Sequence, residues 1–223
     1  ELDVQMRQRQ SGLDLVLVVK GPYIDAGQIE SWREYLGTPV VCWNPDDPLD
    51  RAISNRGAGI SAAAVAYDLY VTWSESVAVK LRSIGARVIV IPFGWDEQAF
   101  FPDPSNQELV NEIRPRVTFV GTWTRERERW LKAIAEARPL VFGNGWPKRI
   151  RGLEIRPALE SRDLRAVLGY SNVSLNFLRK QNAYSHNMRT YEILGSGGWQ
   201  LAKESPDHEK LSRRYESLKQ FSS

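Results

Sequence analysis

Alternating blocks of apolar and polar positions predict a repeated strand–helix order in the first half of the chain. Four apolar runs are typical of strands, at residues 14–21, 39–48, 68–76 and 86–96. The first of them is continuous enough to suit a strand buried on both faces. The segments between them predict helices at residues 26–36, 51–64 and 76–84. This order predicts right-handed parallel crossovers and a sheet covered by helices on both faces.

The same order restarts after a segment rich in proline, aspartate and asparagine. Residues 96–107 have the composition of a linker, so we place a boundary within residues 102–106 and expect domains at residues 1–103 and 104–223. The second half predicts strands at 116–122, 139–146, 152–159, 172–178 and 199–202, and helices at 125–137, 161–169 and from 186 onward. The expected fold class is α/β, with two Rossmann-like doubly wound parallel-sheet domains facing a cleft at the carboxyl ends of their strands.

The end of the chain contains a helix with unusual polar residues, in the stretch HNMRTYEILGSGGWQL from His186 to Leu201. His186, Arg189 and Glu192 follow one another at helical spacing and form a polar ridge. The amino end of a helix that follows a strand favours an anion such as phosphate, because its first N–H groups have no partner within the helix. The alternative interpretation is a surface helix on which Arg189 and Glu192 form an ordinary ion pair.

Four predicted strands end in tryptophan followed by polar or charged residues: Trp43, Trp73, Trp123 and Trp146. Ligands of open α/β sheets bind at the carboxyl ends of strands. Flat aromatic faces suit sugar rings and nucleobases, so a sugar nucleotide is the expected ligand. The alternative is that these side chains pack beneath loops.

Composition narrows the choice of function. The chain has 223 residues, of which 42% are hydrophobic and 26% charged, as is usual for a globular protein. A formal charge of +3 is too balanced to favour a nucleic-acid partner, and we expect no membrane-spanning segment. The two histidines and Cys42 lack the spacing of metal ligands, so no metal is expected. A single cysteine excludes a disulfide within the chain, which fits the cytoplasm.

Several stretches together resemble one family of enzymes. FVGTWTRERERWLKAI, VFGNGW, GYSNVSLNFLR and HNMRTYEILGSGGWQL are similar to the CgeB-like (spore maturation protein type) glycosyltransferases of the GT-B class. The first half matches in outline through DLVLVVKG, WNPDDP, YDLYVTWSES and IPFGWDEQAFFP. The resemblance is strongest from residue 117 to residue 201 and most specific in RTYEILGSGG. The family's opening strand, glycine loop and helix have no counterpart here, so the N-terminal domain is expected to be incomplete.

The resemblance implies that the chain transfers a sugar from a nucleotide donor, UDP- or GDP-sugar, to an unknown acceptor without a bound metal. The second domain would hold the donor, with Glu192 accepting from its ribose and cationic and amide groups stabilising the departing diphosphate. The expected donor-binding residues are Arg127, Ser185, Asn187, Arg189, Glu192, Gly121, Trp123 and Asn144. The candidate catalytic residues are His186 and, on the first domain, Asp46 and Asp47, which would orient the acceptor or act as base. Asp46 and Asp47 can equally be part of a simple turn.

Two other functions remain open at this stage. A module that binds a nucleotide sugar without turnover would keep the same site. A sugar-nucleotide epimerase of GT-B type would use the same donor but invert a hydroxyl group on it. Donor hydrolysis separates the first alternative from a transferase, and the stereochemistry of the recovered donor separates the second.

Overall fold

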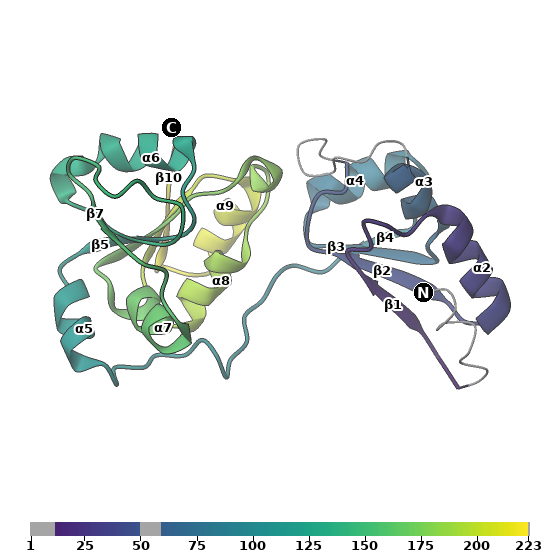
Figure 1. The fold of residues 1–223 in the computed structure, drawn as a ribbon, viewed down its shortest axis with the longest axis horizontal. Coiled ribbons are helices and arrows are strands. Elements are labelled where there is room, and N and C mark those ends of the chain that lie inside the picture. Colours follow the sequence, from purple (N-terminus) through teal and green to yellow (C-terminus); the bar gives the residue numbers. More distant parts are fainter. Residues whose placement is uncertain (1–11, 50–58, 223) are drawn as a thin grey trace. The chain divides into compact units, whose positions relative to one another are not determined.

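A computed structural model of the chain describes residues 12–49 and 59–222. These residues belong to two compact units, Glu1–Pro92 and Phe93–Ser223, called here the first and second unit (Figure 1). The first part of the predicted helix 51–64 lies outside the described residues. Among the described residues, no helix is both long and apolar enough to cross a bilayer.

The first unit has a four-stranded parallel sheet in the order β1-β2-β3-β4. Its elements are β1 (Val16–Val19), α2 (Ala26–Leu36), β2 (Val40–Asn44), α3 (Gly59–Ala66), β3 (Leu69–Thr72), α4 (Glu75–Ser83) and β4 (Val88–Val90). Helix α2 matches its predicted bounds because both ends are signalled locally. Asp25 and Gln28 form a reciprocal capping box, and Gly37 closes the helix with φ 62°.

Among the described residues, helices cover one face of this sheet, whereas the sequence predicted cover on both faces. Each crossover advances in the same direction across the sheet, so the right-handed rule places α2, α3 and α4 on one face (Figure 1). No described helix covers the opposite face, where Leu17 and Val19 are each 55% exposed and Trp43 is 38% exposed. Strand β1 is therefore an edge strand of the described sheet with one exposed face, although its sequence suited a strand buried on both.

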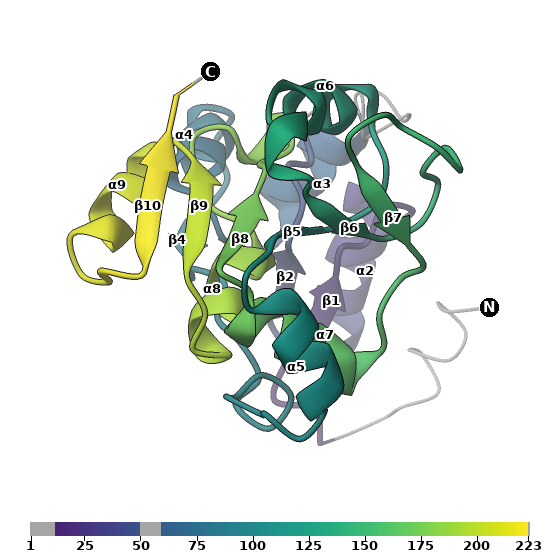
Figure 2. The same ribbon diagram turned by 90° about the vertical axis from the view of Figure 1, so that its left-hand side faces the viewer.

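The second unit has a six-stranded parallel sheet in the order β10-β9-β8-β5-β6-β7 (Figure 2). Its helices are α5 (Gln107–Ile113), α6 (Arg125–Ala133), α7 (Ser161–Tyr170), α8 (Met188–Gly195) and α9 (Pro206–Ser212), with 3-10 turns η1 (Ala135–Ala137) and η2 (Lys180–Asn182). Its strands are β5 (Val117–Val120), β6 (Leu140–Phe142), β7 (Glu154–Arg156), β8 (Val173–Asn176), β9 (Gln200–Lys203) and β10 (Leu218–Phe221). Elements α9 and β10 lie beyond the last element predicted from the sequence.

Helices cover both faces of this second sheet, as predicted. Two clusters of buried residues show this: Phe119 and Val141 pack with Leu131 of α6, whereas Leu140 and Phe142 pack with helices α5 and α7. The chain leaves β5 in one direction for β6 and later returns past it to β8. The strand order therefore reverses between β5 and β8, and ligands of such folds bind at the carboxyl ends of the strands beside this switch point.

The contact boundary between the units falls at Pro92–Phe93, whereas the sequence suggested residues 103 and 104. The intervening segment packs on the rest of the second unit. The backbone N–H of Phe93 donates to His186, the ring of Trp95 covers Gly195, and Asp103 pairs with Arg165 of α7. Prolines and polar residues gave the segment the composition of a linker, but these long-range contacts attach it to the second unit.

Candidate functional site

The loops that follow β5 and β6 are joined at the carboxyl edge of the second sheet. Gly121 N donates to Phe142 O at 2.8 Å, and Trp123 N donates to Asn144 O at 2.9 Å. A Cβ atom at Gly143, whose φ is 149°, would lie 2.1 Å from Gly121 O. Only glycine allows this approach of two backbones. The glycines of the GTW and GNGW motifs are therefore required by the close packing of the two loops.

Of the three residues predicted to bind the donor in these loops, two present a side chain to solvent. Trp123 is 38% exposed, and its Nε1 donates to Glu128 Oε2 at 2.8 Å, which fixes the ring. The side chain of Asn144 is also exposed. Gly121 has a packing role, because a Cβ there would lie 2.9 Å from the ring of Phe119.

The four strand-end tryptophans do not share one role. Trp73 is buried, and Trp146 packs edge-on against Phe119 while its Nε1 donates to Gly121 O at 2.8 Å. Both support the alternative of packing beneath loops. Trp43 and Trp123 keep an exposed aromatic surface, each at 38%. Among these four, Trp123 is therefore the candidate on the second unit for stacking against a ligand.

Three arginines from three different elements gather beside the switch point. Arg127 lies in the first turn of α6, Arg179 follows β8, and Arg189 lies in the first turn of α8. Burial, and after it the positive charges of Arg179 and Arg189, together lower the pKa of Arg127 to about 10. Arg127 Nη1 donates to Thr122 O at 2.8 Å, and its guanidinium lies 5.3 Å from the centre of the Phe119 ring. Mutually repelling cations held together in this way are typical of an anion site.

Glu192 lies next to this arginine cluster. Its Oε2 is 2.7 Å from Nη1 of Arg189, and the two side chains are 12% and 24% exposed. The ion pair of the alternative interpretation is therefore present, but on a mostly buried surface. The helix is turned so that Thr190 and Ile193 are buried while Met188 is exposed, which places the polar ridge beside the core.

Ser185, predicted to bind the donor, and His186, predicted to be catalytic, both have buried side chains. Ser185 Oγ donates to Asp207 Oδ2 at 2.7 Å, and His186 Nδ1 lies 2.9 Å from the same oxygen. His186 Nε2 accepts from Phe93 N at 3.1 Å. Both ring nitrogens of His186 thus have partners inside the protein, and its catalytic role stays a prediction.

Asn187 serves the helix itself. Its Oδ1 accepts from Thr190 N at 3.1 Å, which caps the amino end of α8, and its Nδ2 donates to Asn176 Oδ1 at 2.9 Å. Buried amide and hydroxyl groups of Asn176, Thr190 and Gln200 continue this network beneath the helix. The side chain predicted to bind phosphate thus holds α8 against β8 and β9.

In the first unit, Asp46 and Asp47 lie in turns and pair with lysines. Asn44 Oδ1 accepts from Asp46 N, and Asp47 Oδ1 accepts from Leu49 N, both at 2.9 Å, which is the hydrogen-bond pattern of Asx turns. Asp46 lies 2.7 Å from Lys20 Nζ, and the buried Asp47 lies 2.9 Å from Lys80 Nζ. This supports the interpretation as a turn, and Asp47 is not exposed to an acceptor.

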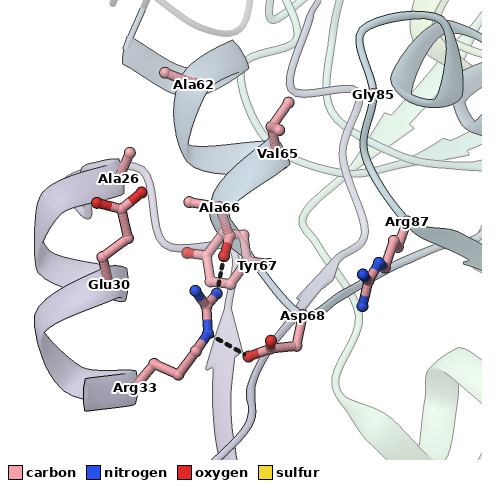
Figure 3. Close-up of a pocket in the computed structure, with 10 residues that line it drawn as sticks. All are labelled: Ala26, Glu30, Arg33, Ala62, Val65, Ala66, Tyr67, Asp68, Gly85 and Arg87. Carbon is pink, nitrogen blue, oxygen red and sulfur yellow. Dashed lines mark hydrogen bonds and ion pairs between the residues drawn. The ribbon is translucent and has the colours of Figure 1, made fainter. Parts of the chain in front are cut away.

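The first unit also has a cavity of about 700 Å³ near the amino ends of its strands (Figure 3). Asp68 there accepts from Val40 N at 2.8 Å and from Arg33 Nε at 3.0 Å. Burial raises the pKa of Asp68, but these two bonds outweigh it and hold the pKa below its usual value. The Arg33–Asp68 pair joins α2 to the starts of β2 and β3, at the sheet end opposite to the usual ligand site.

The sequence interpretation missed Arg179 and Asp207. Arg179 directly follows the predicted strand 172–178, so its place at a strand end was a usable signal. Asp207 follows Ser205 and Pro206, the typical cap and first residue of a helix, and this signal predicts α9. Among the described residues, no group of three or more His, Cys, Asp or Glu side chains is arranged to hold a metal ion. Metal independence stays a prediction.

Comparisons with known proteins agree with this description. Residues 125–221 match a family described as glycosyl transferase-like. The sucrose-phosphate synthase of Thermosynechococcus elongatus is similar in structure, with a TM-score of 0.71 and 14% identity over 97% of this chain and 62% of its own. The trehalose-6-phosphate synthase of E. coli bound with UDP-2-fluoro glucose has a TM-score of 0.65 and 13% identity over 91% of this chain and 61% of its own.

A third solved structure, a UDP-forming trehalose-phosphate synthase from Burkholderia xenovorans, has a TM-score of 0.63 and 12% identity over 91% of this chain and 62% of its own. This chain thus spans less than two thirds of the length of these proteins. The likenesses confirm the predicted GT-B-like α/β fold. A search of the curated proteins finds no match. The CgeB-like subfamily stays a prediction.

Proposed function

We propose that this chain is the larger part, or a shortened form, of a glycosyltransferase that moves a sugar from a UDP- or GDP-sugar to an acceptor still to be identified. The observation that carries the proposal is the cluster of Arg127, Arg179 and Arg189 at the carboxyl edge of the second sheet. A diphosphate bound there would neutralise their repulsion. The same charges would stabilise the nucleoside diphosphate as the bond to the sugar breaks, which is electrostatic catalysis.

The remaining parts of the proposed donor site surround this cluster. Glu192 is acceptor-only, as the two hydroxyls of a ribose require, and its ion pair with Arg189 joins the ribose position to the diphosphate position. Trp123 offers a fixed and partly exposed ring for stacking against a base or sugar. The match of residues 125–221 to glycosyl transferase-like proteins, and the UDP-2-fluoro glucose named for a structural relative, support the same ligand class.

Titration calorimetry with UDP and GDP tests the proposal. We expect Arg127→Ala to weaken binding by about 10- to 100-fold, because a hydrogen bond to a charged group contributes about 1.5–3 kcal/mol. Arg129→Ala is the matched control, since Arg129 is an exposed arginine on the same helix outside the cluster. Nucleoside diphosphate should also raise the melting temperature, and Glu192→Ala should abolish that rise. Equal binding by Arg127→Ala and Arg129→Ala would contradict the assignment.

Binding without turnover is the second candidate function. The observation in its favour is that all three candidate catalytic side chains are occupied: His186 by Phe93 and Asp207, Asp46 by Lys20, and Asp47 by Lys80. Hydrolysis of UDP-glucose in the absence of acceptor decides between the two. Release of glucose supports the transferase, whereas tight binding with no release supports the module.

A further inference from the structure

The loop that leads into α8 is held by the first turn of α9. Asp207 Oδ2 accepts from two groups of this loop, Ser185 Oγ at 2.7 Å and His186 Nδ1 at 2.9 Å. Ser205, the cap of α9, donates from its Oγ to Ser185 O at 2.5 Å. Two neighbouring residues of the loop thus depend on the amino end of one helix, and Asp207 is the only one of these groups that carries a full charge.

The hydrogen bonds fix the protonation of both partners. His186 Nε2 accepts from Phe93 N, so the single proton of the neutral ring is on Nδ1 and points to Asp207. Burial raises the pKa of Asp207, but the bonds from His186 and Ser185 outweigh it and keep the pKa below its usual value. Asp207 is therefore a carboxylate that accepts both hydrogens at one oxygen.

The loop is separated from Arg189 of the arginine cluster by only a few residues of the chain. His186 directly precedes Asn187, the cap of α8, and Arg189 lies in the first helical turn. The ring of His186 packs edge-on against Phe93 and against Tyr191, with centroid distances of 5.6 Å and 5.2 Å. Asn182 Nδ2 also donates to His186 O at 2.9 Å. A displacement of His186 would therefore move the start of α8 and, with it, Arg189 and Glu192.

We propose that Asp207 is a positioning residue of the donor site: through Ser185 and His186 it sets the place at which α8 begins and so the place of Arg189. The inference rests on the proposed function, since it concerns the same diphosphate site. The hydrogen bonds that join Asp207 to the loop are the two at Oδ2. It orders the site without touching the diphosphate.

Two substitutions at Asp207 separate geometry from charge. In Asp207→Asn the amide oxygen can accept the same two hydrogens, whereas Asp207→Ala removes both bonds. We expect Asp207→Ala to weaken UDP binding about tenfold and Asp207→Asn to restore it to within about threefold of wild type. Glu209→Ala is the control, because Glu209 is an exposed acid on α9 whose carboxylate pairs with Arg213 at 2.6 Å.

Imidazole ¹⁵N NMR supplies a readout that general destabilisation would not reproduce. The chain has two histidines, so both rings can be assigned. We expect the Nδ1–H tautomer for His186 in the wild type and in Asp207→Asn, and a changed Nδ1 resonance in Asp207→Ala. If Asp207→Ala does not fold, Ser185→Ala replaces it as the milder variant, with a smaller loss of affinity in the same direction.

The outcomes distinguish the two proposals. If the wild-type chain binds neither UDP nor GDP, the proposed function and this inference both fail. If it binds UDP and Asp207→Ala binds equally well, or if Asp207→Asn is as weak as Asp207→Ala, only the positioning role is overturned. Weak UDP binding by Glu209→Ala would also overturn the positioning role, because the loss of affinity would then not be specific to Asp207.

Discussion

The two units are built from the same strand–helix alternation but differ in how the chain crosses the sheet. In the first unit each strand is added on the same side, so α2, α3 and α4 share one face. In the second unit the order reverses between β5 and β8, so helices cover both faces and two hydrophobic clusters form. One reversal of direction therefore separates a sheet with an uncovered apolar face from one with two cores.

The reversal also explains where the candidate site lies. Where neighbouring strands connect in opposite directions, the loops that follow them separate and leave room at the carboxyl edge. Arg127 comes from the β5 side of this point, and Arg179 and Arg189 come from the β8 side. The first unit has no such reversal among its described strands, and its Asp46 and Asp47 are held in turns by lysines.

The largest expected effect tests the difference in burial. Leu140 is fully buried in the second unit, so Leu140→Ala should cost about 2–5 kcal/mol of unfolding free energy through lost contacts and a cavity. Leu17 in the first unit is 55% exposed, and Leu17→Lys should cost less than about 0.5 kcal/mol. Urea unfolding followed by circular dichroism measures both. A large loss in Leu17→Lys would mean that the uncovered face of the first sheet is covered in solution.

A smaller effect compares glycines with positive φ in the two units. Gly37 closes α2 with open space around it, so Gly37→Ala should cost only the left-handed conformation, about 1–2 kcal/mol. At Gly143 the added Cβ would also meet Gly121 O at 2.1 Å, so Gly143→Ala should cost more than Gly37→Ala and should weaken UDP binding by displacing the β5 loop. Equal stability losses, measured by thermal unfolding, would contradict the close approach of the two loops.

The smallest expected effect is pH-dependent and tests the boundary between the units. Hydrogen bonds from Ser105 and then from Arg165 lower the pKa of Asp103 to about 2, against an unfolded value of about 3.9. The stabilisation is therefore present above about pH 4 and is lost as the pH falls toward 2. Asp103→Asn lacks this stabilisation, so its melting temperature should lie slightly below that of the wild type at pH 6 and converge with it near pH 2. A constant difference would show that the Asp103 carboxylate does not hold the segment to α7.

Local signals explain which parts of the fold the sequence could predict. The capping box of Asp25 with Gln28 and the closing Gly37 defined α2 to the residue, and apolar runs located the strands up to β9. Coverage of a sheet depends instead on strand order, which is a long-range property that periodicity does not contain. For this reason the apolar run of β1 was interpreted as doubly buried, while the structure exposes Leu17 and Val19.

In the candidate site too, local features could be predicted from the sequence and long-range contacts could not. The helical positions of Arg127, Arg189 and Glu192 could be predicted because they follow from sequence spacing, while their role in binding stays a prediction. Ser185 and His186 were assigned to the ligand because they precede a helix, but they bond with Asp207, about twenty residues away in the sequence. A hydrogen bond between distant residues leaves no pattern in a single sequence, so a buried polar residue and an exposed one could not be told apart.

The attachment of Phe93 and Trp95 to α8 has a consequence for how such proteins can be recombined. The short stretch that follows the first unit contacts the loop before α8, through Phe93 at His186, and the last residue of α8, through Trp95 at Gly195. A chimera that takes the first unit from a related protein should therefore be joined before Phe93. A junction near Pro104 would replace Phe93 and Trp95 as well, and we expect it to disturb the packing of α8.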